Sequence, residues 1–140
     1  MIQRIQSIWL LLAAIFAFAT LKLSFYSGNK LDALTNAKVF LPLNATTNTM
    51  LFILTVAVAV AALVVIFLYK DRKRQILVSI GVLAVSILNI IFYFSEIKKF
   101  IEGQIVLTSI ITFTIPIFLL LAIRSIWKDE KLVKSTDRLR

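Results

Sequence analysis

The sequence has 140 residues and contains no cysteine and no histidine. The first absence excludes disulfides, thiolate nucleophiles and Cys metal sites, and the second excludes His-ligated haem or zinc, Ser-His triads and His proton shuttles. Charged residues are scarce, at 16% against about 25% in soluble domains. Hydrophobic residues make up 60% of the chain, so too few polar side chains remain to cover the surface of a small soluble domain. We therefore predict a protein embedded in a membrane.

Four stretches match the length of about 20 mostly apolar residues that a membrane-crossing helix needs. They cover about 7–25, 50–69, 76–94 and 105–127. Ala17-Phe18-Ala19 fits the small-x-small pattern of signal-peptide cleavage, but the apolar run continues past Ala19, so we expect the first helix to be retained. The predicted fold is an all-α, four-helix transmembrane bundle over residues 1–127, followed by a basic cytoplasmic tail over 128–140.

The distribution of basic residues predicts the orientation of this bundle. An even number of spans puts both termini on one side, and that side collects eleven of the sixteen Lys and Arg residues. Cytoplasmic flanks are richer in Lys and Arg, so we expect both termini in the cytoplasm. Trp9, Tyr69 and Trp127 then fall at the inner boundary, where amphipathic rings favour the headgroup level.

The basic residues on the predicted cytoplasmic side are expected to contact anionic lipid headgroups, because a cation near such a surface contributes about 1 kcal/mol. The residues that we assign to this contact are Lys70, Arg72, Lys73, Arg74, Lys128 and Lys131. The cytoplasmic chain is too short to build a nucleic-acid recognition fold. The bilayer and its acidic lipids are therefore the first predicted partners.

Polar side chains inside the spans form a second candidate site. Ser86 and Asn89 share a face of the third predicted helix, and Thr108 and Thr112 lie at a similar depth in the fourth. A carboxamide in lipid is costly unless it is paired, so we expect Asn89 to bond to another span, with Thr108 and Thr112 as its best partners. This cluster is either structural glue between helices or a polar ligand or ion site.

Pro116 lies inside the fourth predicted span. Its ring clashes with the carbonyl of Thr112, which predicts a kink. Such a kink is either static or part of a gate.

Small residues and connections complete the pattern. Ala13 and Ala17, and Ala57 and Ala61, are spaced to let helices approach closely.

The outer segment 27–49 is too apolar for a solvated coil. This composition favours either a short amphipathic piece at the bundle end or a partner contact. Thr47 or Asn48 is expected to cap the second helix. The outer link 95–104 is expected to extend both neighbouring helices.

No acidic residue is expected at mid-depth, which argues against proton-coupled transport, carboxylate ion sites and intramembrane aspartyl proteolysis. The outer pair Glu96 and Glu102 is spaced six apart and does not share a helix face. We therefore predict a protein that is not an enzyme, with no catalytic, cofactor-binding or metal-binding residue.

The N-terminal block Met1-Ile2-Gln3-Arg4-Ile5-Gln6-Ser7, running into Trp9, is the most distinctive motif. With four spans in this length, the chain resembles a family of small inner-membrane proteins of Bacteroidota whose function is unknown. The resemblance implies a location in the bacterial cytoplasmic membrane and no particular activity. Physically, Gln3, Arg4 and Gln6 of the block are expected at headgroup level.

The favoured function is that of a small integral membrane protein acting by association, as an accessory, assembly or complex subunit. Its partner is expected to be another membrane protein or a second copy of itself. The alternative is a small carrier or lipid-binding protein with a polar cavity between the third and fourth spans, in the outer half of the membrane.

Overall fold

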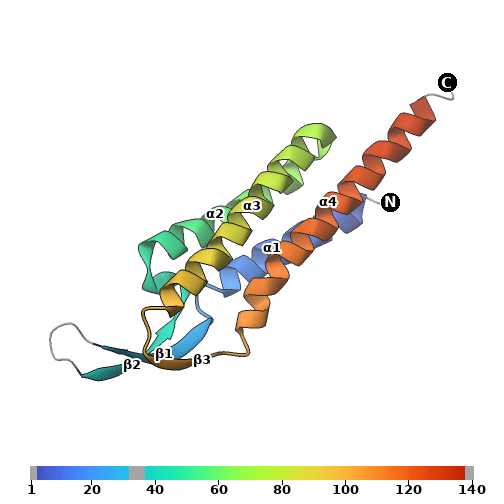
Figure 1. The fold of residues 1–140 in the computed structure, drawn as a ribbon. Helices are drawn as coiled ribbons and strands as arrows, with labels where there is room; N and C mark the ends of the chain where they lie inside the picture. The colour runs from blue at the N-terminus through green and yellow to red at the C-terminus, as the bar shows by residue number, and fades with distance from the viewer. Residues whose placement is uncertain (1–2, 32–36, 138–140) are drawn as a thin grey trace.

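The protein is a bundle of four helices closed at one end by a small sheet, as seen in a computed structural model that describes residues 3–31 and 37–137 (Figure 1). The helices are α1 (Gln3–Ala19), α2 (Thr49–Phe67), α3 (Arg72–Ile97) and α4 (Ser109–Asp137). The strands are β1 (Tyr26–Leu31), β2 (Lys38–Leu43) and β3 (Glu102–Ile105), and the short 3-10 turns are η1 (Ala45–Thr47) and η2 (Leu68–Lys70). The predicted four-helix fold is confirmed, and the sheet is an addition to it.

Three of the helices, α2 with its η2 extension, α3 and α4, are long and apolar enough to cross a membrane. The first helix is shorter, with 17 residues, or about 26 Å at ~1.5 Å per residue. It ends at Ala19 and not near residue 25, because Thr20 to Lys22 form a turn that leads into the sheet. The last helix continues beyond Trp127 to Asp137, so the described part of the predicted tail is helical.

The helices form a closed four-membered ring of contacts. The first helix packs against α2 and α4, and α3 packs against the same two neighbours. The start of α1 and the far end of α4 lie at one end of the bundle, and the sheet lies at the other (Figure 1). We call these the terminal end and the sheet end.

Each helix buries a row of residues spaced alternately by three and four positions, and Ala14 and Ala59 are buried beside the rows of α1 and α2. These rows are Gln6, Leu10, Ala13 and Ala17 in α1; Leu51, Thr55, Val58, Ala62 and Val65 in α2; Gln75, Ser79, Val82, Ser86, Asn89 and Tyr93 in α3; and Thr112, Ile115, Leu119, Ala122, Ile126 and Asp129 in α4. A repeat of about 3.5 residues is the pattern of helices that pack side by side in a bundle. We call the four rows together the buried seam.

The middle of the buried seam is apolar and rich in alanine. Ala13 and Ala17 are fully buried there, as their spacing predicts. The corresponding prediction for α2 is wrong at Ala57, which is exposed, whereas Ala61 is partly buried against the core. The fully buried alanines of α2 are Ala59 and Ala62, which are spaced by three and not by four.

The sheet specifies one sequence prediction and corrects another. The outer segment, expected to be a short amphipathic piece or a partner contact, contains an antiparallel pair, β1 with β2. The outer link does not simply extend both helices, because β3 pairs with β1 on its other side, in the order β2-β1-β3. The pairing of β3 with β1 joins segments that lie far apart in the sequence, which no local pattern reveals. The capping prediction is confirmed at Asn48, whose side chain accepts a hydrogen bond from the Met50 N–H at 2.9 Å.

Aromatic side chains join the sheet to the helix ends. Phe25, just before β1, stacks on Tyr93 of α3 with ring centroids 4.4 Å apart, and lies 5.6 Å from the ring of Phe113 in α4. Tyr26 meets Phe100 edge-on at 5.3 Å. Together with Leu43 and other apolar neighbours, these rings form a second core that fixes the sheet on the bundle.

The centre of the sheet depends on two glycines that face each other. Gly28 of β1 pairs with Gly103 of β3. A Cβ on Gly28 would lie 2.3 Å from the Glu102 carbonyl oxygen, and one on Gly103 would lie 2.6 Å from the Gly28 Cα and from the Tyr26 ring. The ring of Tyr26 therefore lies close over the paired glycines, and no other residue type fits there.

We predict that Gly103→Ala lowers the free energy of unfolding by about 1–3 kcal/mol, the usual effect of overpacking. The measurement is denaturant unfolding of the purified protein in detergent. The control is Gly81→Ala in α3, where an added Cβ meets nothing within 4 Å; this change is expected to be neutral or to stabilise by up to about 1 kcal/mol. Equal effects of the two substitutions would contradict the close approach of β1 and β3.

Candidate functional site

The polar residues of the buried seam gather near its two ends, and these two layers are the candidate sites of the bundle. At the sheet end, Asn89 of α3 donates from Nδ2 to the Thr55 hydroxyl of α2 at 3.0 Å. The buried Tyr93 hydroxyl lies beside the same Thr55. Thr55, Asn89 and Tyr93 thus form one layer, which we call the sheet-end polar layer.

The predicted partners of Asn89 are therefore wrong. Asn89 bonds to α2 and not to Thr108 or Thr112 of the chain around α4. Thr108 lies in the turn before α4 and donates to the Ser24 carbonyl, which ties that turn to the segment after α1. The sequence indicated that Asn89 would bond to another span but gave no means of choosing between the facing helices.

The remaining members of the predicted cluster take structural places. Ser86 is buried and its hydroxyl donates to the Leu83 carbonyl of its own helix at 2.7 Å. Thr112 is buried in α4, one turn before Pro116, and α4 runs on as a helix through that proline. The kink stays a prediction. Asn89 and Thr108 donate to other segments of the chain and Ser86 donates within its own helix, so the four residues do not meet as one cluster.

At the terminal end, a network that the sequence did not suggest joins three helices. Gln6 of α1 donates from Nε2 to the Asp129 carboxylate of α4 and to the Ser125 carbonyl, the latter at 3.3 Å. Arg72 of α3 donates to the backbone carbonyl of Asp129 at 2.9 Å. We call Gln6, Arg72 and Asp129 the terminal clamp. Nearby, Gln75 donates to the Val65 carbonyl at 3.0 Å and ties α3 to α2.

The terminal clamp places two polar side chains inside the bundle. Gln6 and Asp129 are each 5% exposed. Asp129 follows Trp127 by two positions and lies at the terminal end, not at mid-depth of the spans, and the headgroup level expected for Gln6 stays a prediction. A signal for both existed in the sequence. Gln6 precedes the buried Leu10 by four positions, and Asp129 follows the buried Ile126 by three, so both continue the rows of the seam.

The six basic residues assigned to lipid contact separate into three kinds. Arg72 is half-buried in the terminal clamp, and Arg74 pairs with Asp71 at 2.9 Å. The other four, Lys70, Lys73, Lys128 and Lys131, are exposed. Arg74 is exposed as well, so five of the six side chains are available to lipid, and the contact itself stays a prediction.

The sheet carries a shallow cavity of about 280 Å³ on the face that holds Ser27, Phe40 and Gln104. A Lys38–Glu102 ion pair at 3.3 Å bridges β2 and β3 across β1. Within residues 3–31 and 37–137, no group of three or more acidic, His or Cys side chains could hold a metal ion.

The fold and its polar layers define a small helical membrane protein. The chain belongs to the family described as a domain of unknown function (DUF4293), whose model matches residues 2–139. No curated protein and no solved structure matches it.

We predict that Thr55 and Asn89 are energetically coupled across α2 and α3. A double-mutant cycle with Thr55→Val and Asn89→Ala should give a coupling energy of about 0.6–1.7 kcal/mol, as found for side-chain hydrogen bonds between membrane helices. The measurement is unfolding in detergent or bicelles.

The matched control for this cycle pairs Asn89→Ala with Thr112→Val. Because Asn89 bonds to Thr55, this second cycle should be additive within about 0.5 kcal/mol. Coupling to Thr112 in place of Thr55 would show that Asn89 faces α4.

Proposed function

We propose that this protein is a non-enzymatic accessory or assembly subunit of a larger membrane complex, and that the β1–β2 hairpin is where it contacts its partner. The observation that carries the proposal is an apolar strand exposed outside the bundle. The strand β2 lies at the edge of the sheet, and Val39, Phe40 and Leu41 are exposed on it. Phe40 is the most exposed of them, at 67%.

The position of the hairpin favours a protein over lipid as its contact. The hairpin projects past the helix ends at the sheet end of the molecule (Figure 1). If α2, α3 and α4 cross the bilayer, lipid chains surround the helices and not this strand. Exposed apolar patches in an aqueous setting are typical of protein interaction sites, so we commit to the extramembrane part of a neighbouring membrane protein.

The chemistry of β2 favours a specific partner over repeated self-pairing. Pro42 has no backbone N–H, so the strand lacks one hydrogen-bond donor at this residue. Proline is tolerated in an edge strand where the missing N–H would point away from the sheet. Lys38 at the other end of the strand adds a charge, and both features limit open-ended pairing between copies. Only a short row between them is left for docking.

The interior supports a role without catalysis. The described hydrogen bonds of Gln6, Asn89 and Gln75 are made between helices, which is what holding the bundle together requires. In lipid, such bonds and close packing replace the hydrophobic force that assembles soluble bundles. This supports a scaffold whose partner surface lies outside the membrane.

We place the protein in the bacterial cytoplasmic membrane, with both termini in the cytoplasm and the sheet outside. The support is the excess of Lys and Arg around the terminal end, together with the resemblance of the N-terminal block. The partner surface then faces the extracytoplasmic side.

The docking prediction is tested with Phe40→Asp. Charge at this position should abolish co-purification of the partner from gently solubilised native membranes, since a buried unpaired carboxylate is costly. The control is Thr46→Asp, which adds the same charge at an exposed position of η1 and should leave the partner bound. An unmodified chain that reproducibly purifies alone contradicts the proposed function.

The orientation prediction uses the absence of cysteine, since each introduced cysteine is then the sole thiol. Thr46→Cys should react with a membrane-impermeant maleimide in intact cells, and Ser135→Cys only after permeabilisation. The reverse pattern would show that the sheet lies in the cytoplasm.

A further inference from the structure

Two grooves open between helices at the terminal end, and they differ in charge. One lies between α1 and α2, has a volume of about 490 Å³, and is lined by uncharged residues that include Gln6, Tyr69 and Gln75. The other lies between α3 and α4, has a volume of about 500 Å³, and is lined by Lys73, Ile76, Leu77, Ile80, Trp127 and Glu130. We call the second one the α3–α4 groove.

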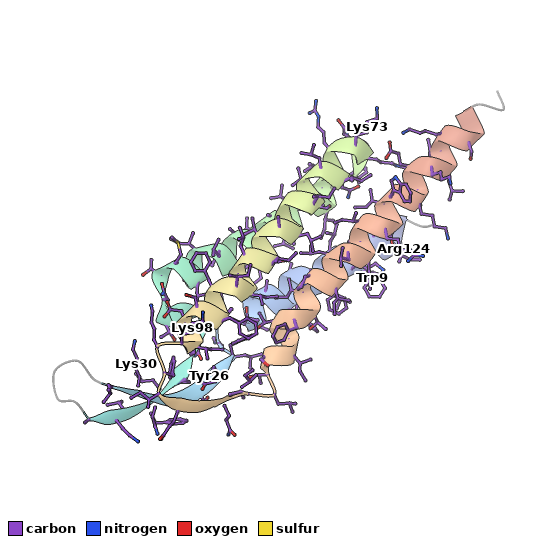
Figure 2. The ribbon with its side chains drawn as sticks, in the orientation of Figure 1. Trp9, Tyr26, Lys30, Lys73, Lys98 and Arg124 are labelled. Atoms are coloured by element: carbon purple, nitrogen blue, oxygen red, sulfur yellow. The ribbon has the colours of Figure 1, made fainter. Side chains whose placement is uncertain are left out.

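The α3–α4 groove combines an apolar wall with a cationic mouth. Leu77 and Ile80 are 72% and 51% exposed, so no part of the described protein covers them. Lys73 lies on the first turn of α3, at the terminal end (Figure 2), and lines the groove together with Trp127 and Glu130 of α4. In the described part of the chain, Lys73 is within ion-pair distance of no acidic group.

The one acidic residue of the lining is already neutralised by its own helix. Glu130 pairs with Lys134 one turn further along α4, at 2.7 Å. The nearby carboxylate of Asp129 is buried and accepts from Gln6 on another face of α4. The charge that the groove presents is therefore that of Lys73, with Lys128 and Lys131 exposed on the same stretch of α4.

Trp127 marks the depth of the groove in the bilayer. Its indole is 62% exposed and lies on α4 next to the apolar wall. Indole rings prefer the boundary between acyl chains and headgroups. A molecule in this groove would therefore place an apolar part beside Leu77 and Ile80 and a charged part beside Lys73, which is the arrangement of a phospholipid.

We propose that the α3–α4 groove is a binding site for one acidic glycerophospholipid, whose acyl chain packs against Leu77 and Ile80 and whose phosphate headgroup contacts Lys73. The volume is within the range of about 300–1,000 Å³ typical of ligand clefts. The two grooves at the terminal end are similar in size and differ in charge, because the lining of the α1–α2 groove is uncharged. The positive charge of Lys73 therefore provides the selection for an acidic headgroup. This site is independent of the docking hairpin, which lies at the sheet end.

The test uses Trp127 as the reporter. The chain has two tryptophans, and Trp9→Phe leaves Trp127 alone while keeping an aromatic ring against Phe118. The full-length variant is placed in vesicles of phosphatidylcholine and phosphatidylglycerol at a fixed ratio. Bromine quenches indole fluorescence at short range. In one sample the acyl chains of phosphatidylglycerol are brominated. In the other sample an equal mole fraction of phosphatidylcholine has brominated chains instead.

The expected result is stronger quenching by the brominated phosphatidylglycerol, corresponding to about a fivefold enrichment beside Trp127, the factor expected from one basic residue at an anionic surface. Lys73→Gln should bring the two samples close to equality. Lys98→Gln removes the same charge at the other end of α3 (Figure 2) and should leave the difference unchanged. High salt should also reduce the difference.

Three results would overturn the proposal. Equal quenching by the two lipids would show that the groove holds ordinary annular lipid. A preference that survives Lys73→Gln would show that the headgroup is recognised elsewhere. Weak quenching by both lipids would show that protein covers Trp127. None of these results bears on whether a partner binds the hairpin.

Discussion

The structure depends on close approach between helices that gain little from the hydrophobic effect. Lipid chains are as apolar as leucine, so helices in a bilayer associate through packing and hydrogen bonds. This chain supplies the first requirement with alanines in the middle of the buried seam, such as Ala13, Ala17 and Ala62. It supplies the second at the two ends, where the terminal clamp and the sheet-end polar layer link facing helices.

The two polar layers also fix the register of the bundle. If the seam were wholly apolar, one helix could shift along its neighbour by one three-and-four repeat and still place apolar residues against apolar residues. The Asn89–Thr55 bond sets α3 against α2, and the Gln6–Asp129 bond sets α1 against α4. A slip along the helix axis would leave these side chains unpaired in a low-dielectric interior, where an unmade hydrogen bond is costly. Register is thus set by a few polar residues at the bundle ends.

The sequence predicts the elements that obey local rules and misses those that depend on distant pairing. The long apolar runs predicted α2, α3 and α4, and Asn48 was recognised as a cap from its type and position. The strand β3 was missed because it pairs with β1 from more than seventy positions away, at Gly103. The strand β2 is close to β1 in the sequence, but its run of exposed apolar residues lacks the alternation typical of a strand. The terminal clamp was missed for a different reason: Gln6 was interpreted by its polarity and Asp129 was not singled out, although the spacing of both residues already placed them in the seam.

The sheet is connected to the interior of the bundle through packed side chains. This connection holds the hairpin in one position before a partner binds. The chain passes from β1 back to Phe25, whose ring stacks on Tyr93, and Tyr93 lies beside Thr55 in the sheet-end polar layer. The close Gly28–Gly103 pair then holds β1 against β3, which leads into α4. An isolated two-stranded hairpin is only marginally stable in water, but this one has a third strand and an aromatic core beneath it. A partner that binds the exposed strand therefore meets a surface that is already ordered, so little of the binding free energy is lost in ordering it.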